Sequence, residues 1–186
     1  GTYQVTVTDA MGCQDSISIT VIQPQPLVAI ADSINVLCHG DTNGVLIGSI
    51  SGGTAPATYV WNNGLIGDTI YNMPPDFYTV YAFDANGCSA YDNTEIVEPD
   101  SLYIDTLYIK PESCWNGVDG EIAVSINGGT QPYNYYWNTT PPLQDTLLTG
   151  LLSGNYTIFV TDTNGCSDSL TVFVPRDSVD LTLAQI

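Results

Sequence analysis

Five cysteines are the residues of this 186-residue sequence whose chemistry is most distinctive. They form no Cys-x-x-Cys pair, and no histidine accompanies them at the spacing of a zinc site. Thiols that are not held for a metal pair as disulfides in an oxidising compartment, so the sequence predicts disulfide bonds. The five residues are Cys13, Cys38, Cys88, Cys114 and Cys166.

Acidic residues dominate the charge, because 20 Asp and Glu face only Lys110 and Arg176, for a formal net charge of −18. Such a chain repels phosphate backbones and anionic lipids, which excludes nucleic acid as the partner. Carboxylates can instead recruit divalent cations, so calcium is the one candidate cofactor. The apolar runs are shorter than the roughly 18 residues of a membrane helix, and no membrane span is expected in this portion.

The sequence repeats itself. The phrase TDTNGC at 161–166 matches FDANGC at 83–88 and TDAMGC at 8–13, at spacings of about 75 to 78 residues that are typical of tandem repeats. The segments 38–54 and 114–130, which begin with a cysteine and end in Gly-Gly-Thr, also match.

These matches predict four segments. They are the closing hairpin of a preceding repeat at 1–26, complete repeats at 27–101 and 102–177, and the start of a following repeat at 178–186.

The repeats leave two ways of pairing the cysteines. If bonds form within a repeat, Cys38 pairs with Cys88 and Cys114 with Cys166, while Cys13 bonds an upstream cysteine. If bonds join consecutive repeats, Cys13 pairs with Cys38 and Cys88 with Cys114, while Cys166 bonds a downstream cysteine. Closing loops of about 50 and about 26 residues contributes about 4 and about 3.5 kcal/mol, so loop length does not decide.

Apolar residues alternate with polar ones in most segments, as at Tyr156, Ile158 and Val160, which indicates half-buried β-strands. Each repeat offers about six or seven short strands and no helical pattern. The predicted fold is all-β, with tandem immunoglobulin-like antiparallel β-sandwich repeats of about 75 residues. Trp61 and Trp137, at matching positions, are expected to fill the two cores.

The repeated phrase Asp-x-Asn-Gly-Cys is typical of a tight hairpin corner. We expect Asp to cap one strand, Asn and Gly to take left-handed conformations, and Cys to begin the next strand. Acidic and amide side chains in the loop after the first cysteine of each repeat are the candidate calcium ligands. They match a calcium loop only in part, because its terminal bidentate Glu is absent. These residues are Asp41, Asn43, Asp119 and Glu121.

Catalytic groups are missing from the pattern. His39 is the only histidine, and Trp115 takes its place in the second repeat, so the repeats share no histidine site. No nucleophile stands beside a base, and we expect no enzyme. Trp115 is the candidate aromatic for an alternative function, that of a carbohydrate-binding module.

The order of landmarks in each repeat resembles the SprB-type repeat of giant surface adhesins of gliding Bacteroidota. The order is Cys, Asn/Asp-Gly, Gly-Gly-Thr, Pro-Tyr, Trp, Gly-x-Tyr-Thr, Asp-x-Asn-Gly-Cys. In the second repeat it is carried by Cys114, Gly117, Gly128, Gly129, Thr130, Pro132, Tyr133, Trp137, Gly154, Tyr156, Thr157, Asp162, Asn164, Gly165 and Cys166. The first repeat departs from it at Ala57, which stands in place of the Tyr after Pro56.

This resemblance implies a long extracellular protein of the bacterial cell surface, exported by the type IX system. Its repeats would form a stalk or filament that spans distance and bears force during gliding or attachment. The implied partners are neighbouring repeats, identical chains in a filament, and an external surface or polysaccharide reached through other domains. The alternative is a carbohydrate-binding or calcium-binding module of a secreted protein.

Asp followed by Ser or Thr and then Ile, Leu or Val occurs eight times. The pattern resembles the O-glycosylation signal of Bacteroidota, which implies glycans on these hydroxyl groups. The alternative is that these repeats simply begin their strands in this way. The hydroxyl residues are Ser16, Ser33, Thr69, Ser101, Thr106, Thr146, Ser169 and Ser178.

Overall fold

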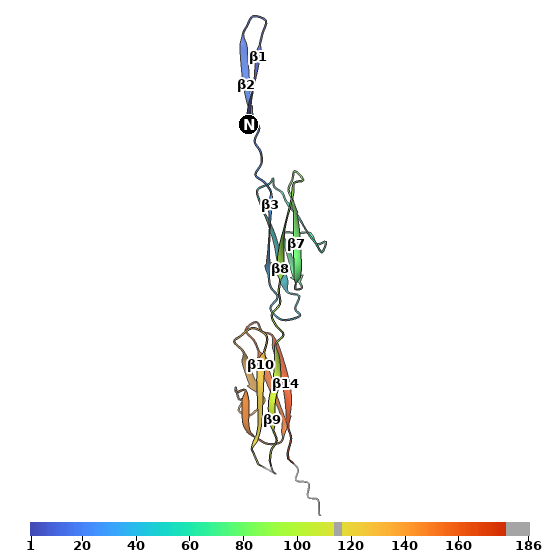
Figure 1. Cartoon of the computed structure of the whole chain (residues 1–186), viewed down its shortest axis with the longest axis vertical. Helices are drawn as coiled ribbons and strands as arrows, with labels where there is room; N and C mark the ends of the chain where they lie inside the picture. The colour runs from blue at the N-terminus through green and yellow to red at the C-terminus, as the bar shows by residue number, and fades with distance from the viewer. Residues whose placement is uncertain (114–116, 178–186) are drawn as a thin grey trace, which may run out of the picture. The chain divides into compact units, whose positions relative to one another are not determined.

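The computed structural model describes residues 1–113 and 117–177, and every regular element in these ranges is a β-strand (Figure 1). The strands are β1 (Thr2–Thr8), β2 (Gln14–Thr20), β3 (Val28–Ile34), β4 (Gly44–Ser51), β5 (Thr58–Trp61), β6 (Thr69–Met73), β7 (Asp76–Phe83), β8 (Ser89–Ile96), β9 (Tyr103–Lys110), β10 (Gly120–Asn127), β11 (Asn134–Trp137), β12 (Leu147–Leu151), β13 (Gly154–Thr161) and β14 (Ser167–Val174). The described ranges hold no helix that is long and apolar enough to cross a membrane.

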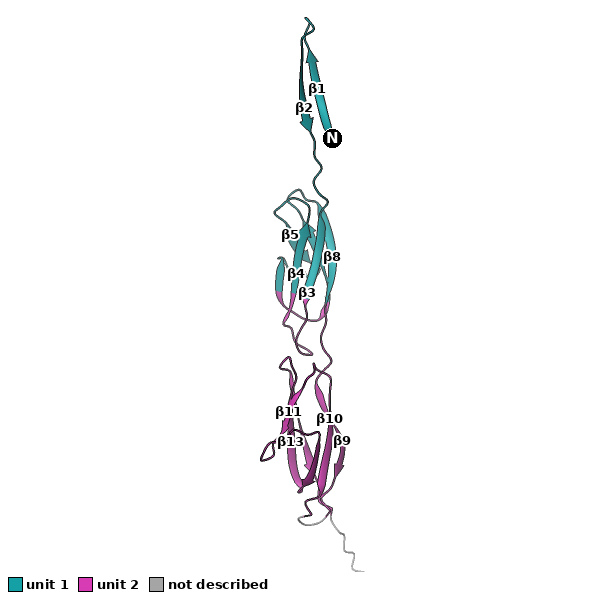
Figure 2. Cartoon of the chain, turned by 90° about the vertical axis from the view of Figure 1, so that its left-hand side faces the viewer, with its two compact units in different colours: residues 1–33, 46–70, 77–95 teal, residues 34–45, 71–76, 96–186 magenta. Residues whose placement is uncertain are grey.

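The strands gather in two compact units (Figure 2). Unit 1 comprises Gly1–Ser33, Leu46–Ile70 and Phe77–Glu95, and unit 2 comprises Ile34–Val45, Tyr71–Asp76 and the chain from Ile96 onward. The division does not follow the sequence repeats. Three segments that the sequence assigns to the first repeat, residues 34–45, 71–76 and 96–101, group with unit 2.

Each complete repeat contains two three-stranded sheets with the same strand order. In the first repeat the sheets are β3-β4-β6 and β5-β7-β8, and in the second they are β9-β10-β12 and β11-β13-β14. In the second repeat β10 is antiparallel to β9 and β12, and β13 is antiparallel to β11 and β14. The prediction of immunoglobulin-like antiparallel sandwich repeats is confirmed.

The period-two pattern places one face of each sheet in a core. Ile122, Ile158 and Val160 are at most 1% exposed, and Trp137 and Trp61 are 0% and 1% exposed. The indole N–H of each ring also has a hydrogen-bond acceptor. The indole N–H of Trp137 donates to the backbone oxygen of Asp145 (2.8 Å), and that of Trp61 donates to the backbone oxygen of Gly67 (3.0 Å). Burial of these rings as core filling is confirmed.

The Gly-Gly pair of each repeat allows a close backbone crossing. Gly52 and Gly128 have φ angles of 72° and 67°, in the left-handed region that favours glycine. A Cβ atom on Gly128 would lie 1.9 Å from the backbone oxygen of Ser101, and one on Gly52 would lie 2.1 Å from that of Pro26. At both places the chain entering a repeat passes directly over the pair, so no other residue fits.

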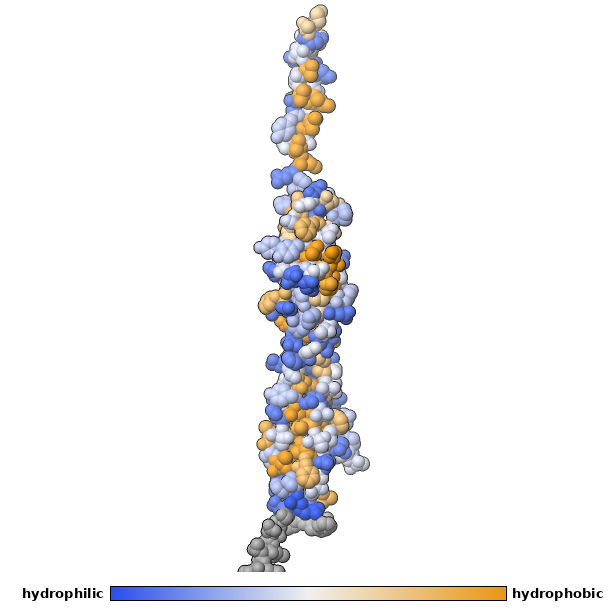
Figure 3. Space-filling model, turned by 90° about the vertical axis from the view of Figure 1, so that its right-hand side faces the viewer, coloured by the Kyte–Doolittle hydropathy of each residue, from blue (hydrophilic) through white to orange (hydrophobic). Residues whose placement is uncertain are grey.

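Hairpin β1–β2 of unit 1 carries the same apolar pattern without a second sheet over it in the described chain. Every residue of both strands is exposed, and apolar side chains show as orange along the upper segment in Figure 3. Val5 and Val7 are 55% and 65% exposed, whereas Val80, at the position of Val5 in the first complete repeat, is 0% exposed. An isolated two-stranded hairpin is marginally stable in water.

We therefore expect a large contrast in amide hydrogen exchange. The backbone amides of Val5 and Ile17 should exchange at least about 100-fold faster than those of Val80 and Ile158, because only the latter lie in covered sheets. Exchange followed by mass spectrometry or NMR on the whole chain measures this. Equal protection of the hairpin and β7 would show that the hairpin is stabilised by something besides its own strand pairing.

Candidate functional site: the Cys38–Cys166 disulfide and its corner turn

The structure contains a disulfide between Cys38 and Cys166, with Cα atoms 5.6 Å apart and a sequence separation of 128. Both cysteines lie in unit 2, because Ile34–Val45 belongs to that unit. In the sequence, Cys38 follows the first strand of one repeat and Cys166 ends the corner turn of the next. The bond therefore joins two consecutive repeats covalently.

Neither expected pairing scheme is correct. Cys38 bonds neither Cys88 nor Cys13, and Cys166 bonds neither Cys114 nor a downstream cysteine. Cys88 and Cys13 are free and exposed thiols. Cys114, which both schemes also assigned, lies outside the described residues.

The direction of the strands explains why the first scheme fails. The first and last strands of the first repeat, β3 and β8, run side by side in the same direction. The backbone N–H of Ala31 donates to Asp92 (2.9 Å), and just beyond the ends of both strands the backbone N–H of Val97 donates to Asn35 (3.0 Å). Residues after β3 therefore lie beside residues after β8.

Cys38 follows β3 and Cys88 precedes β8, so the two lie at opposite ends of their own repeat. The backbone N–H of Gly40 donates to the Glu98 carboxylate (2.7 Å), which places the Cys38 loop just beyond the end of β8. The eight residues of β8 span about 26 Å, whereas a disulfide needs Cα atoms within about 7 Å. A bond between Cys38 and Cys88 is impossible without unfolding the repeat.

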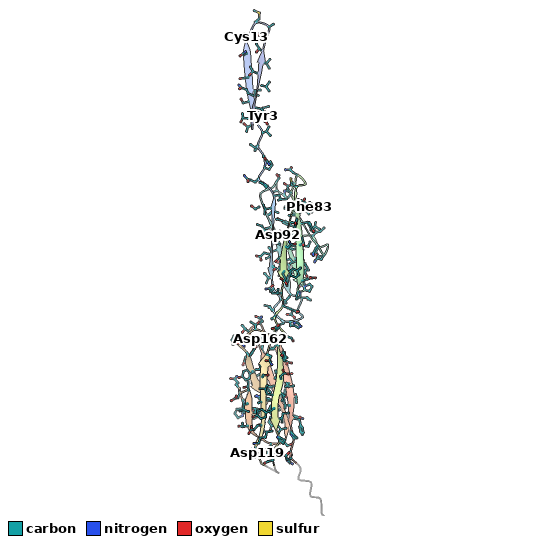
Figure 4. All side chains as sticks on the ribbon, in the orientation of Figure 1. Tyr3, Cys13, Phe83, Asp92, Asp119 and Asp162 are labelled. Carbon is teal, nitrogen blue, oxygen red and sulfur yellow. A yellow bond between two sulfur atoms is a disulfide. The ribbon has the colours of Figure 1, made fainter. Side chains whose placement is uncertain are left out.

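The second repeat is built in the same way. Glu112, after β9, and Arg176, after β14, form a parallel β-bridge, so these two strands also run in one direction. Figure 4 shows the corner residue Asp162 at one end of this sandwich and Asp119 at the other. The corner cysteine and the loop after β9 thus cannot meet within one repeat.

Asp162 organises the corner that carries Cys166. It is 6% exposed, and its Oδ1 atom accepts the backbone N–H groups of Asn164 and Cys166, both at 2.9 Å. Its Oδ2 atom accepts the backbone N–H of Thr130 at 2.8 Å. One buried carboxylate therefore satisfies three backbone donors and fixes the turn against the Gly-Gly loop.

The expected left-handed Asn-Gly pair is only half correct. Gly165 has a φ angle of 88°, but Asn164 is not among the residues with positive φ. Its side chain has a different task, because Nδ2 donates to Thr130 Oγ1 (3.1 Å) and to the backbone oxygen of Leu37 (2.9 Å). Asn164 holds the loop that presents Cys38, a role that turn chemistry alone does not reveal.

The candidate calcium ligands Asp41 and Asn43 lie in the Cys38 loop and bind each other and the backbone. Asn43 Nδ2 donates to Asp41 Oδ2 (3.0 Å), and Asn43 Oδ1 accepts the backbone N–H of Leu37 (3.2 Å). Glu98 also contacts His39, with Nδ1 and Oε2 3.3 Å apart. These contacts shape the loop that carries Cys38.

The other two candidate ligands, Asp119 and Glu121, also have protein partners. The backbone N–H of Ser113 donates to Asp119 (2.9 Å) and holds the pKa of that carboxyl below its ordinary value. The Tyr108 hydroxyl (2.9 Å) and the Lys110 ammonium (3.2 Å) donate to Glu121 and lower its pKa. Across the described ranges no three His, Cys, Asp or Glu side chains are grouped to hold a metal ion, and calcium stays a prediction.

Glu112 is a buried carboxylate that the sequence did not single out. It is 0% exposed, and it accepts the N–H of Gly117 (3.1 Å), the N–H of Ser153 (3.0 Å) and the Arg176 Nε–H (3.0 Å). Burial raises the pKa of Glu112, but the Ser153 and Arg176 bonds, the arginine charge and the Gly117 bond outweigh it. The pKa lies below the ordinary 4.5.

This arrangement predicts a pH-dependent contribution to stability. Because folding lowers the pKa of Glu112, its contribution is complete above about pH 4.5 and is lost as pH falls through the folded pKa. The melting temperature of Glu112→Gln should be well below that of the wild type at pH 7, and the gap should narrow as the pH is lowered below about 4.5. Thermal melts across this range measure the gap. Exposed Glu95→Gln is the control, and a pH-independent gap would contradict the assignment.

The candidate glycosylation hydroxyls differ in exposure. Ser33, Thr69 and Thr146 are half-buried, and Ser33 Oγ donates to the backbone oxygen of Glu95 (2.7 Å). Ser178, like the candidate ligand aromatic Trp115, lies outside the described residues. Glycosylation stays a prediction, and the exposed candidates are Ser16, Ser101, Thr106 and Ser169.

A family model described as "SprB repeat" matches the chain twice, at residues 30–65 and 106–141. The two matched segments are in phase with the repeats and each begins in the first strand of a sandwich. None of the curated proteins compared with the chain matches it.

Several solved structures match the chain at low identity. The N-terminal eight Ig domains of Down Syndrome Cell Adhesion Molecule match at 15% identity and a TM-score of 0.48, over 94% of this chain and 31% of that one. The amphioxus IgVJ-C2 molecule matches at 14% identity and a TM-score of 0.35, over 78% of this chain and 96% of that one. An intimin fragment, solved with the intimin-binding domain of its receptor Tir, matches at 15% identity and a TM-score of 0.37, over 86% of this chain and 64% of that one. The chain thus spans under two thirds of the first and third of these.

Proposed function

We propose that the chain, which the SprB repeat model matches at two places, is a segment of the stalk or filament of a long secreted adhesin on a bacterial cell surface. In this role the repeats span distance and bear force, in gliding or in attachment. Ligand recognition belongs to other parts of the protein. The repeats themselves carry out no catalysis.

The observation that carries this proposal is the bond between Cys38 and Cys166. A disulfide that joined two strands of one sandwich would stabilise that sandwich alone. A disulfide with one cysteine in each of two consecutive repeats limits how far the chain between them can be extended. Such a bond suits a protein that is pulled along its length, and it requires an oxidising compartment outside the cytosol.

The charge and the cores support the same role. Each repeat buries a tryptophan and its neighbours in a core of its own, as expected for modules that add up to a long array. The net charge of −18 keeps neighbouring chains soluble at the high local density of a cell surface. Strands of eight residues span about 26 Å, so each added repeat lengthens the array by roughly 25 to 35 Å.

Immunogold labelling tests the location. Antibody against residues 102–177 should label intact cells of the source bacterium, and brief protease treatment of those cells should remove the label. Label that appears only after the cells are broken would contradict a surface stalk.

In-frame removal of residues 102–177 from the full protein tests the role. Because one whole period is removed, the alternation of loop and corner cysteines along the chain is kept. A stalk segment is dispensable for recognition, so capture of polysaccharide-coated beads by the cells should be unchanged. Loss of bead capture with normal surface labelling would instead identify residues 102–177 as a carbohydrate-binding module.

A further inference from the structure

The structure leaves the thiols of Cys88 and Cys13 free and exposed, although both occupy the position of the bonded Cys166 in their own corner turns. We propose that Cys88 forms a disulfide with the loop cysteine of the repeat on its N-terminal side, the equivalent of Cys38 in that repeat. Each repeat would then be bonded to both of its neighbours. This inference rests on the proposed tandem array and adds its covalent connectivity.

The corner that carries Cys88 is built like the corner that carries Cys166. Asp84 is 7% exposed, and its Oδ1 atom accepts the backbone N–H groups of Asn86 (2.9 Å) and Cys88 (2.8 Å). Its Oδ2 atom accepts the backbone N–H of Thr54 (3.0 Å), as Asp162 accepts that of Thr130. Burial raises the pKa of Asp84, but the backbone donors Cys88, Thr54 and Asn86 outweigh it and the pKa is lowered. The Cys88 thiol therefore lies in a turn whose backbone is fixed by the ionised Asp84 carboxylate.

The asparagine that binds the Cys38 loop also has an equivalent in the first repeat. Asn164 Nδ2 donates to Thr130 Oγ1 and to the backbone oxygen of Leu37. Asn86 Nδ2 makes the first of these bonds, to Thr54 Oγ1 at 2.9 Å. A loop cysteine arriving at Cys88 would bring the backbone oxygen that completes the second.

The end of the presenting loop is a repeated feature as well. Asn43 accepts the backbone N–H of Leu37, the residue before Cys38, at 3.2 Å. Asp119 occupies the place of Asn43 in the second repeat and accepts the backbone N–H of Ser113 at 2.9 Å. The corner turn and the hydrogen bond to the residue before the loop cysteine thus recur from repeat to repeat.

The observed bond has a direction along the chain, from the loop of one repeat to the corner of the next. Applied one repeat earlier, this direction assigns to the Cys88 corner the loop of the preceding repeat. Applied once more, it assigns Cys13 to the loop of the repeat before that. The hairpin corner at Asp9 agrees, because Asp9 Oδ1 accepts the backbone N–H groups of Met11 (2.8 Å) and Cys13 (2.9 Å).

Bond formation is an oxidation and needs an electron acceptor. The two thiols lose two protons and two electrons as their sulfur atoms join. We assign the acceptor to a dithiol–disulfide oxidant protein of the oxidising compartment, whose own disulfide is reduced to two thiols by thiol–disulfide exchange. The exposure of Cys88 gives such an oxidant access to its sulfur.

Non-reducing peptide mapping of the full protein from its native source tests the proposal. Free thiols are alkylated before proteolysis, and the cross-linked peptides are identified by mass spectrometry. We expect the Cys88 peptide bonded to a peptide whose cysteine follows the first strand of the preceding repeat, with less than about one tenth of Cys88 alkylated. Alkylated Cys88, or Cys88 bonded to Cys114 or to a second corner cysteine such as Cys13, would overturn the proposal.

A variant of the full protein separates pairing from folding. In Cys88→Ser, one upstream loop cysteine should become fully alkylated while Cys38 and Cys166 stay bonded. The matched variant Cys166→Ser should instead release Cys38. If Cys88→Ser releases no thiol, the pairing is overturned. Surface labelling of intact cells does not depend on Cys88, so that result would leave the proposed stalk function standing.

Discussion

Replacing Cys166 with serine should lower the free energy of unfolding by about 4 to 5 kcal/mol, the loop-closure contribution of a bond across a sequence separation of 128. The removed bond restricts the unfolded chain by less than about 1 kcal/mol more than a bond within one sandwich would, because loop-closure entropy grows only with the logarithm of loop length. Urea unfolding followed by tryptophan fluorescence measures the shift in midpoint. Adding a reductant to the wild type should produce the same shift.

Cys88→Ser is the matched control for this prediction. It removes the sulfur at the equivalent corner, which is a free thiol in this chain, so the change in free energy of unfolding should stay within about 0.5 kcal/mol. Equal effects of Cys166→Ser and Cys88→Ser would show that the corner cysteines act through local packing rather than through the bond.

The second large effect is expected from Trp137→Ala. The indole is 0% exposed and donates to the backbone oxygen of Asp145, so its removal leaves a cavity and an unpaired acceptor. Truncation of a buried tryptophan costs about 3 to 5 kcal/mol. Differential scanning calorimetry should show a lower melting temperature for the second repeat.

Two controls locate this effect. Tyr136→Ala, at an exposed position on the same strand, should cost less than about 1 kcal/mol. Trp61→Ala should lower the stability of the first repeat by an amount similar to that of Trp137→Ala, because both rings are buried and both donate to a backbone oxygen. A small effect of Trp137→Ala would contradict the assignment of that ring to the core.

The fold could be predicted from the sequence because the burial pattern of a β-sandwich is local. Alternation at Tyr156, Ile158 and Val160 marks a strand with one buried face, and the match of Trp61 to Trp137 marks the same core twice. Both signals depend on residues a few positions apart. They need no knowledge of how the strands are ordered in the sheets.

The cysteine pairing could not be predicted because it depends on strand direction over a whole repeat. In the connection from β5 to β6 the chain turns back beside β5, where Ile66 forms an isolated antiparallel bridge with Val60 of β5. This additional antiparallel pass of the chain beside β5 sets the direction of the strands that follow. It therefore decides at which end of the sandwich the corner cysteine lies. Short-range sequence patterns do not show it, so Cys38 and Cys88 seemed equally able to meet.

The partners of the Asn164 and Glu112 side chains also could not be predicted from short-range sequence patterns. The Asn-Gly pair is typical of a tight turn, yet the amide of Asn164 serves a loop from the other repeat, over 100 residues away. Glu112 is one carboxylate among 20, and only the fold brings it to Arg176, one of the two cations. The scarcity of cations was the available signal, because a carboxylate buried against a charged side chain could pair only with Lys110 or Arg176.

Force spectroscopy on the whole chain, held at its two ends, tests most directly whether the Cys38–Cys166 bond limits extension between consecutive repeats. The chain would carry Cys13→Ser, Cys88→Ser and Cys114→Ser to prevent other pairings. While the bond is intact, the chain between Cys38 and Cys166, a sequence separation of 128, cannot be stretched. The unfolded oxidised chain should therefore have a contour length about 420 to 460 Å shorter than that of the reduced chain. Equal contour lengths before and after reduction would contradict a covalent link between the repeats and the force-limiting role assigned to it.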